Sequence, residues 1–268
     1  MGWLEVAGLW HSSASARMYP PDPNAPHQHG MNPQGYGMSP QGYGVAESPT
    51  FCPECGAPIQ FRGTTVSAVC EYCNSTVVRT GVDVRLIGKV SALTDNGSPI
   101  VLNARGQYSG VPFVVEGRLQ VQYERGIWNE WFLSFADGTI GWLADAQAQF
   151  AVLRPISPAL VADKVPAFAS LEPGMVLVVA DRQVVVVDAR GAAYRGAEGL
   201  LPFEAVPGMT FYGADLRGYE GEFITLDWGN DPNHQRPIPY MGRSVSLAEI
   251  KLFPLRRFEG WPPAQAPR

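Results

Sequence analysis

Two short cysteine motifs constrain the fold of this 268-residue chain more than any other feature. Cys52 and Cys55 form one Cys-x-x-Cys pair, Cys70 and Cys73 form another, and together they are all 4 cysteines of the sequence. Two such turns that face each other can place four thiolates at the corners of a tetrahedron, the arrangement that structural Zn²⁺ adopts. We therefore predict a zinc ribbon over residues 50–80.

Three alternatives remain for the same cysteine spacing: two disulfides, a redox-active pair, or an iron ion bound by the same four ligands. Zinc is favoured because paired short spacings with no cysteine left over are typical of a metal framework. Pro53 and Gly56 suit the tight turn, since proline fixes φ and glycine accepts a positive φ. A four-thiolate site has no open coordination position, so we expect it to stabilise the fold without catalysing a reaction.

The rest of the chain has the pattern of an all-β protein. The 29 glycines and 24 prolines are spread among valine-rich and aromatic segments, which favours short strands joined by turns over long helices. Segments 113–123, 128–135 and 140–143 alternate in polarity and are separated by turns at 124–126 and 137–138, which predicts an antiparallel meander. We place these strands in a first β domain, residues 81–155, shaped as a small barrel or curled sheet because closure removes exposed edges.

A second small antiparallel β domain is predicted over residues 174–256. It begins with a hairpin in which 175–180 and 184–188 flank the turn at Asp181 and Arg182. Four prolines around residues 156–173 predict a linker between the two domains. Residues 257–268 form a proline-rich tail.

The N-terminal region, residues 1–49, is rich in Pro, Gly, Gln and Tyr, and residues 31–37 are repeated almost unchanged as 38–44. Such a composition cannot bury enough apolar surface to fold, so we predict a disordered tail. A Tyr/Pro strip that binds an aromatic groove of a partner is the alternative. Residues 1–17 differ in character from the rest of the tail, which makes Met18 an alternative start of translation.

Charge and hydropathy exclude several classes of protein. The formal net charge is -5, and two arginines balance two glutamates within the ribbon, so the sequence does not favour nucleic-acid binding. No apolar run reaches the length of a membrane span, and no signal peptide is recognisable. We expect a cytoplasmic protein, where reducing conditions keep the four cysteines available for metal.

Two sets of residues are candidates for function outside the ribbon. Trp128 and Glu130 project from the same side of one predicted strand, and we expect them to line a groove that binds a protein partner; burial of Trp128 in the core is the alternative. Asp215, Asp227 and Glu198 could form a carboxylate site of a hydrolase-like enzyme or of a small-ligand-binding protein.

Catalysis is the weaker interpretation, because the sequence contains no Gly-x-Ser-x-Gly elbow, no phosphate-binding loop and no histidine-rich metal triad. The remaining interpretation is a non-catalytic binding or assembly protein in which the ribbon and the β domains present surfaces to protein partners.

Several segments resemble the bacterial domain-of-unknown-function family 4178. They are Trp128-Asn129-Glu130-Trp131, Phe135-Ala136-Asp137-Gly138, Gly141-Trp142-Leu143, Ala197-Glu198-Gly199-Leu200-Leu201-Pro202, Gly213-Ala214-Asp215-Leu216-Arg217 and Phe223-Ile224-Thr225-Leu226-Asp227. In that family a Cys-Pro-x-Cys-Gly ribbon precedes the β domain. Leu200 departs from the pattern, because a second acidic residue is expected there. The resemblance implies a bacterial cytoplasmic protein, encoded beside small membrane proteins and polyamine-synthesis-like enzymes as partners, and it implies no activity.

Overall fold

The computed structural model describes residues 50–80, 83–89, 93–124, 126–161, 165–234 and 236–259. The predictions for residues 1–49 and for 260–268 lie outside this range. The described part is built from strands with two short 3-10 helices, which confirms the all-β class. None of the helices in this part has the length and apolar character needed to cross a lipid bilayer.

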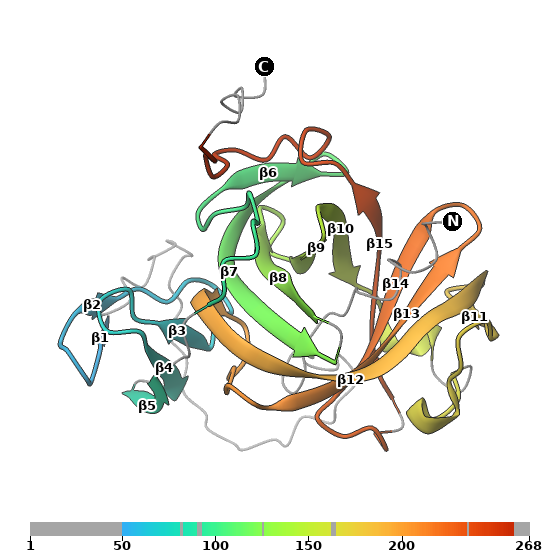
Figure 1. Cartoon of the computed structure of the whole chain (residues 1–268), viewed down its shortest axis with the longest axis horizontal. Coiled ribbons are helices and arrows are strands. Elements are labelled where there is room, and N and C mark those ends of the chain that lie inside the picture. The colour runs from blue at the N-terminus through green and yellow to red at the C-terminus, as the bar shows by residue number, and fades with distance from the viewer. Residues whose placement is uncertain are drawn as a thin grey trace, which may run out of the picture.

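Eight antiparallel strands close into a barrel (Figure 1). Each pairs with its neighbour around the barrel, and the last pairs with the first, in the order β7 (Val111–Tyr123), β8 (Gly126–Phe135), β9 (Ile140–Ala146), β10 (Gln149–Pro155), β15 (Ile238–Val245), β14 (Glu222–Gly229), β13 (Thr210–Gly218) and β12 (Arg182–Leu201). The predicted meander is confirmed as β7, β8 and β9.

Strand β12 closes the barrel, because it is long enough to pair with both β13 and β7. Its first part pairs with β13 as far as Ala193, and the part from Ala193 to Gly199 pairs with β7. Bulges between Val186 and Asp188 and between Tyr194 and Gly196 interrupt the register. Bulges bend a strand and increase its twist, which lets β12 turn from one partner to the other. In Figure 1, β12 runs beneath the barrel from the ribbon to β11.

The two predicted β domains lie in one barrel. The segment 81–155 supplies β7 to β10, and the segment 174–256 supplies β12 to β15. They join at two seams, where β7 pairs with β12 and β10 pairs with β15. Pairing between strands that are distant in sequence leaves no local signal. The sequence prediction, based on turns and alternation alone, therefore placed a domain boundary at the prolines of 156–173, within a single barrel.

The ribbon is an extension of the barrel sheet. It comprises β1 (Thr50–Phe51), β2 (Pro58–Ile59), β3 (Ser67–Val69) and β4 (Ser75–Thr80), followed by β5 (Asp83–Lys89). Strand β3 pairs with the end of β12, where Ala68 lies opposite Leu200. Strand β5 pairs with β4, so its residues belong to the ribbon sheet although the predicted ribbon ended at residue 80.

Apolar side chains make up most of the barrel interior and also cover its outer walls. The interior cluster receives residues from all eight barrel strands, among them Leu119, Trp128, Trp142, Leu153, Tyr194, Phe211, Phe223 and Tyr240. Outside, β6 (Arg105–Tyr108) and the chain around Ile250 cover β7 to β10. The predicted hairpin is confirmed as β11 (Val176–Val179) with β12. The predicted linker carries η2 (Pro158–Leu160) and η3 (Phe168–Ser170), and it packs on β13 and β14 through Val161 and Leu171.

Candidate functional site

The four cysteines lie on two turns of matching geometry. The first pair lies between β1 and β2, and the second lies between β3 and β4. In the first turn the Gly56 amide donates to the Cys52 carbonyl at 2.8 Å, and in the second the Asn74 amide donates to the Cys70 carbonyl at 2.9 Å. Gly56 and Asn74 both have a positive φ, 73° and 57°. Glycine and asparagine are the residues that adopt this conformation most readily, which explains their place after each cysteine pair.

The sulfur atoms converge on one point. All four Sγ atoms lie within 4.8 Å of one another. The Sγ atoms of Cys52 and Cys73 are 3.7 Å apart, and those of Cys55 and Cys70 are 3.6 Å apart. A disulfide would bring two sulfurs to about 2.05 Å. A tetrahedral metal with metal–sulfur distances of about 2.3 Å would hold them about 3.8 Å apart. The arrangement therefore fits a metal site and not a pair of disulfides.

Two of the thiols have pKa values shifted in opposite directions. A hydrogen bond from Ser75 lowers the pKa of the Cys73 thiol to about 6. A backbone hydrogen bond from Ala57 lowers the pKa of Cys55, but burial and the neighbouring cysteines outweigh it and raise this pKa to about 12. Like charges this close disfavour one another, and a bound divalent cation would remove that penalty.

The ribbon is fixed to the barrel by hydrogen bonds between the start of β3 and the chain at the end of β12. The Val66 amide donates to the Leu201 carbonyl at 2.8 Å. The Ser67 hydroxyl, which is buried, donates to the Phe203 carbonyl at 2.6 Å. A metal in the cluster would thus hold a ribbon whose third strand is already part of the barrel sheet.

Trp128 and Glu130 lie inside the barrel, where they cannot form a surface groove. Both side chains have 0% exposure. The indole Nε1 of Trp128 donates to Oε1 of Glu130 at 2.9 Å, and the ring of Tyr123 packs edge-on against the Trp128 ring at 5.5 Å. The two side chains do share one face of β8, as predicted. That face is the barrel interior, and the opposite face is covered as well, so the predicted partner-binding groove is wrong.

Asp215 and Asp227 are close neighbours in the same interior. They lie on the adjacent strands β13 and β14, with exposures of 0% and 1%. The Thr225 hydroxyl donates to Oδ1 of Asp215 at 2.9 Å, and the Gly229 amide donates to Oδ1 of Asp227 at 2.7 Å. The charge of each acts on Glu130. The structure therefore combines residues that sequence reasoning had assigned to two different sites.

Burial raises the pKa of all three carboxyl groups. Burial is the main cause for Glu130, to which Asp215, Asp227 and Asp145 add repulsion. Burial also raises the pKa of Asp227 to about 7. For Asp215, burial and the charge of Asp188 raise the pKa well above its usual value. Perturbed carboxyls in a shared interior are characteristic of functional sites, although buried structural networks perturb pKa values too.

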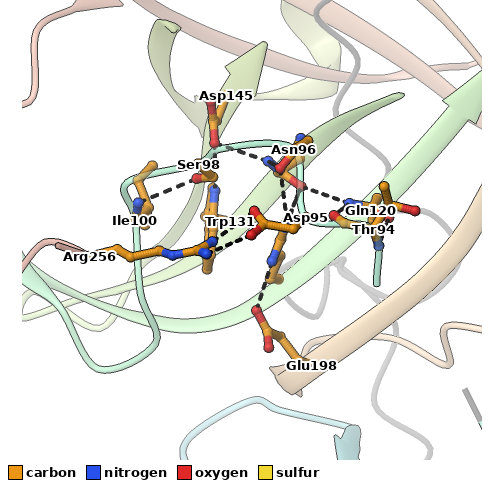
Figure 2. Close-up of polar contacts among 12 residues, drawn as sticks. Thr94, Asp95, Asn96, Ser98, Ile100, Gln120, Trp131, Asp145, Glu198 and Arg256 are labelled. Atoms are coloured by element: carbon orange, nitrogen blue, oxygen red, sulfur yellow. Dashed lines mark hydrogen bonds and ion pairs between the residues drawn. The ribbon is translucent and has the colours of Figure 1, made fainter. Parts of the chain in front are cut away.

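Glu198 does not belong with the other two predicted carboxylates. Its Oε1 lies 3.3 Å from Nη1 of Arg118 on the outer wall of the barrel, and its side chain is 39% exposed. Around it the loop 94–100 covers the outer faces of β7, β8 and β9 (Figure 2).

This polar network on the outer wall was not predicted. Asn129 donates to Asn96 at 3.1 Å and to Oδ2 of Asp145 at 3.0 Å, and Gln120 donates to the Thr94 carbonyl at 2.8 Å. Its buried amides exchange hydrogen bonds with one another and with the loop, which indicates a structural role. The sequence signal for it was Asn129, one of the two polar residues between the tryptophans of the Trp-Asn-Glu-Trp segment.

A comparison with protein families identifies the barrel. The family described as domain of unknown function (DUF4178) matches residues 102–246, which is more than half of the chain. The chain belongs to the DUF4178 family. No significant match was found among curated proteins or among solved structures.

The DUF4178 match covers all eight barrel strands and leaves out the four cysteines. It confirms the resemblance carried by the Trp-Asn-Glu-Trp segment and by the segments around Asp215 and Asp227. Glu130, Asp215 and Asp227 thus lie within the DUF4178 region, whereas the metal-type cluster lies in the ribbon that precedes it.

Proposed function

We propose that this DUF4178 protein is a non-catalytic binding protein of the bacterial cytoplasm, in which one structural zinc ion fixes the ribbon against the barrel. The observation that carries the proposal is the convergence of four Sγ atoms within 4.8 Å at near-tetrahedral spacing. A set of four thiolates suits zinc and leaves no coordination position for a substrate. Four unpaired cysteines are also in keeping with a reducing compartment.

The ribbon is the surface that we propose for contact with a protein partner. Tyr72, in the second cysteine turn, is 74% exposed, and Phe51, next to the first turn, is 54% exposed. Aromatic residues contribute strongly to protein interfaces because they bury a large area at a small cost in side-chain entropy. Metal in the cluster would hold these two side chains at fixed positions.

Capture of partners from native cells with the full chain as bait tests this role. We expect Tyr72→Ala to reduce recovery of the partner at least fivefold without loss of bound zinc. Tyr219→Ala is the matched control, since Tyr219 is 75% exposed on the turn between β13 and β14, far along the chain from the ribbon. Equal recovery with both variants would contradict a role for the ribbon surface.

A further inference from the structure

Three carboxyl groups of the barrel interior, which we call the carboxyl cluster, have no role in the proposed zinc site. Glu130, Asp215 and Asp227 come from β8, β13 and β14 and are at most 1% exposed. Two oxygens, Oε2 of Glu130 and Oδ2 of Asp227, have no hydrogen-bond partner among the described residues. A buried polar atom without a partner costs about 1–3 kcal/mol. Two such atoms in one interior are therefore acceptors that the described side chains and backbone leave available to a donor.

The interior carries an excess of acidic groups. Asp188 lies opposite Asp215 on β12 and forms an ion pair with Arg190, while Arg217 is the next residue on the Asp215 face of β13. With Glu130 and Asp227 this makes four carboxyl groups and two guanidinium groups. If all are ionised, two negative charges are uncompensated, and a buried uncompensated charge is costly. The charge balance favours a positively charged ligand.

The spacing of the carboxyl cluster suits an organic cation better than a metal ion. Among the described residues, the four cysteines are the group of metal-type ligands that meets at one point, and the interior carboxyls form no such group. An ion with carboxylate distances of about 2.0–2.6 Å requires its ligands to meet closely. An ammonium group with three N–H donors can reach separated oxygens.

A hollow lies at one end of the barrel, beside the last residues of β13 and β15. Its volume is about 730 Å³, and it is lined by Phe150, Val185, Arg217, Ser244 and other, mostly apolar residues. Arg217 donates to the Ser244 hydroxyl at 3.1 Å and its guanidinium stacks over the ring of Phe223. Because side chains alternate along a strand, Asp215 follows Arg217 on the inward face of β13. Asp215 thus lies one inward-facing position from the hollow, and Asp227, diagonal to Asp215 on β14, lies deeper in the barrel.

We propose that the barrel interior binds a small organic cation whose primary ammonium group donates hydrogen bonds to Glu130 and Asp227. The ammonium would satisfy Oε2 of Glu130 and Oδ2 of Asp227, and its charge would offset the acidic excess around Asp215. An attached alkyl chain would extend past Arg217 into the apolar hollow. This site is separate from the ribbon and goes beyond the zinc-dependent role proposed above.

Isothermal titration of the full, zinc-loaded chain with n-butylammonium and with methylammonium chloride tests the proposal at pH 7.5. We expect saturable binding of at least one of them, with one site per chain. Tetramethylammonium carries the same charge without N–H donors, so we expect it to bind at least tenfold more weakly. Magnesium chloride should give no heat of binding. Absence of binding by both primary ammonium ions, or equal binding of tetramethylammonium, would overturn the proposal.

Two variants locate the site. Asp227→Asn removes a charge and an acceptor from the cluster with little change in volume, and we expect it to weaken binding at least tenfold. Glu198→Gln is the matched control, because Glu198 was grouped with Asp227 in the sequence but lies on the outer wall. Its affinity should equal that of the native chain. Near-native binding by Asp227→Asn, with an unchanged near-ultraviolet circular dichroism spectrum, would place the ligand elsewhere and overturn the proposal.

Discussion

At the scale of single residues, the barrel interior departs from the usual apolar core. Trp128 and Phe223 pack beside carboxyl groups that are buried as deeply as they are. A carboxyl group in such surroundings retains its proton to a higher pH than it does in the unfolded chain. The buried carboxyl groups therefore lower the stability of the barrel as the pH rises, whereas carboxylates in surface ion pairs raise it.

Asp227 gives the sharpest form of this pH prediction. Its pKa is about 7 in the folded protein against an ordinary value of 3.8. The unfolded chain loses this proton first as the pH rises, so the contribution of Asp227 to stability falls between about pH 4 and pH 7. Asp227→Asn has no such proton. As the pH rises from 5 to 8, we expect the free energy of unfolding of the variant to increase by on the order of 2 kcal/mol relative to that of the native chain.

Urea denaturation followed by tryptophan fluorescence measures this difference without added ligand. Any loss of a bound metal ion at low pH would affect both chains alike, so the comparison isolates Asp227. A constant difference in the free energy of unfolding between pH 5 and pH 8 would show that the folded-state pKa of Asp227 is not raised.

At the scale of elements, closure of the barrel depends on the seam between β7 and β12. Gly117 of β7 lies opposite Gly199 of β12, and a Cβ added at Gly117 would lie 2.0 Å from the Leu200 carbonyl oxygen. Gly199 itself has a φ of 72°. Both glycines allow the two backbones to approach at the point where β12 passes from the barrel to the ribbon.

Gly117→Ala should therefore open this seam. We expect the free energy of unfolding to fall by at least about 2 kcal/mol, since the obstructing atom is backbone and cannot move aside. Gly126→Ala is the control, because the nearest atom to its added Cβ is Cε1 of Tyr123 at 3.7 Å. That variant should stay within about 0.5 kcal/mol of the native chain in urea denaturation. Similar losses for both would contradict the role assigned to the seam.

The strands themselves could be predicted from the sequence, because alternation and turns are local signals. The hairpin at Asp181 and the turn at Asp137 both lie where they were expected. Closure could not be predicted, since the β7–β12 pairing joins residues about seventy to eighty positions apart, from Gln122 with Ala193 to Gly117 with Gly199, and its signal is a pair of glycines. For Trp128 and Glu130 the shared face was correct. The prediction that this face meets solvent was wrong. Both faces of β8 are buried, and alternation alone does not reveal that neither is exposed.

At the scale of the whole molecule, the ribbon and the barrel share a sheet but have separate cores. Buried residues of the ribbon, among them Ile59 and Val77, form a cluster of their own around two of the cysteines. The barrel interior and its outer walls are filled by other residues. Loss of metal should therefore affect the two regions unequally.

Cys55→Ser should lose the metal and unfold the ribbon while the barrel remains folded. In hydrogen exchange we expect amides of β3, β4 and β5 to lose protection at least a hundredfold, and those of β8, β9 and β14 to keep it. Tyr72→Ala, a change in the second cysteine turn that removes no ligand, should retain protection in both regions. Loss of protection throughout the barrel would show that its stability depends on the metal.

The central claim, a structural zinc ion held by four thiolates, is tested most directly by X-ray absorption at the zinc edge on protein purified without chelator. We predict one zinc ion per chain and a first shell of four sulfur atoms at about 2.3 Å, with no oxygen or nitrogen ligand. Iron in place of zinc, or a first shell that contains oxygen or nitrogen, would contradict the claim.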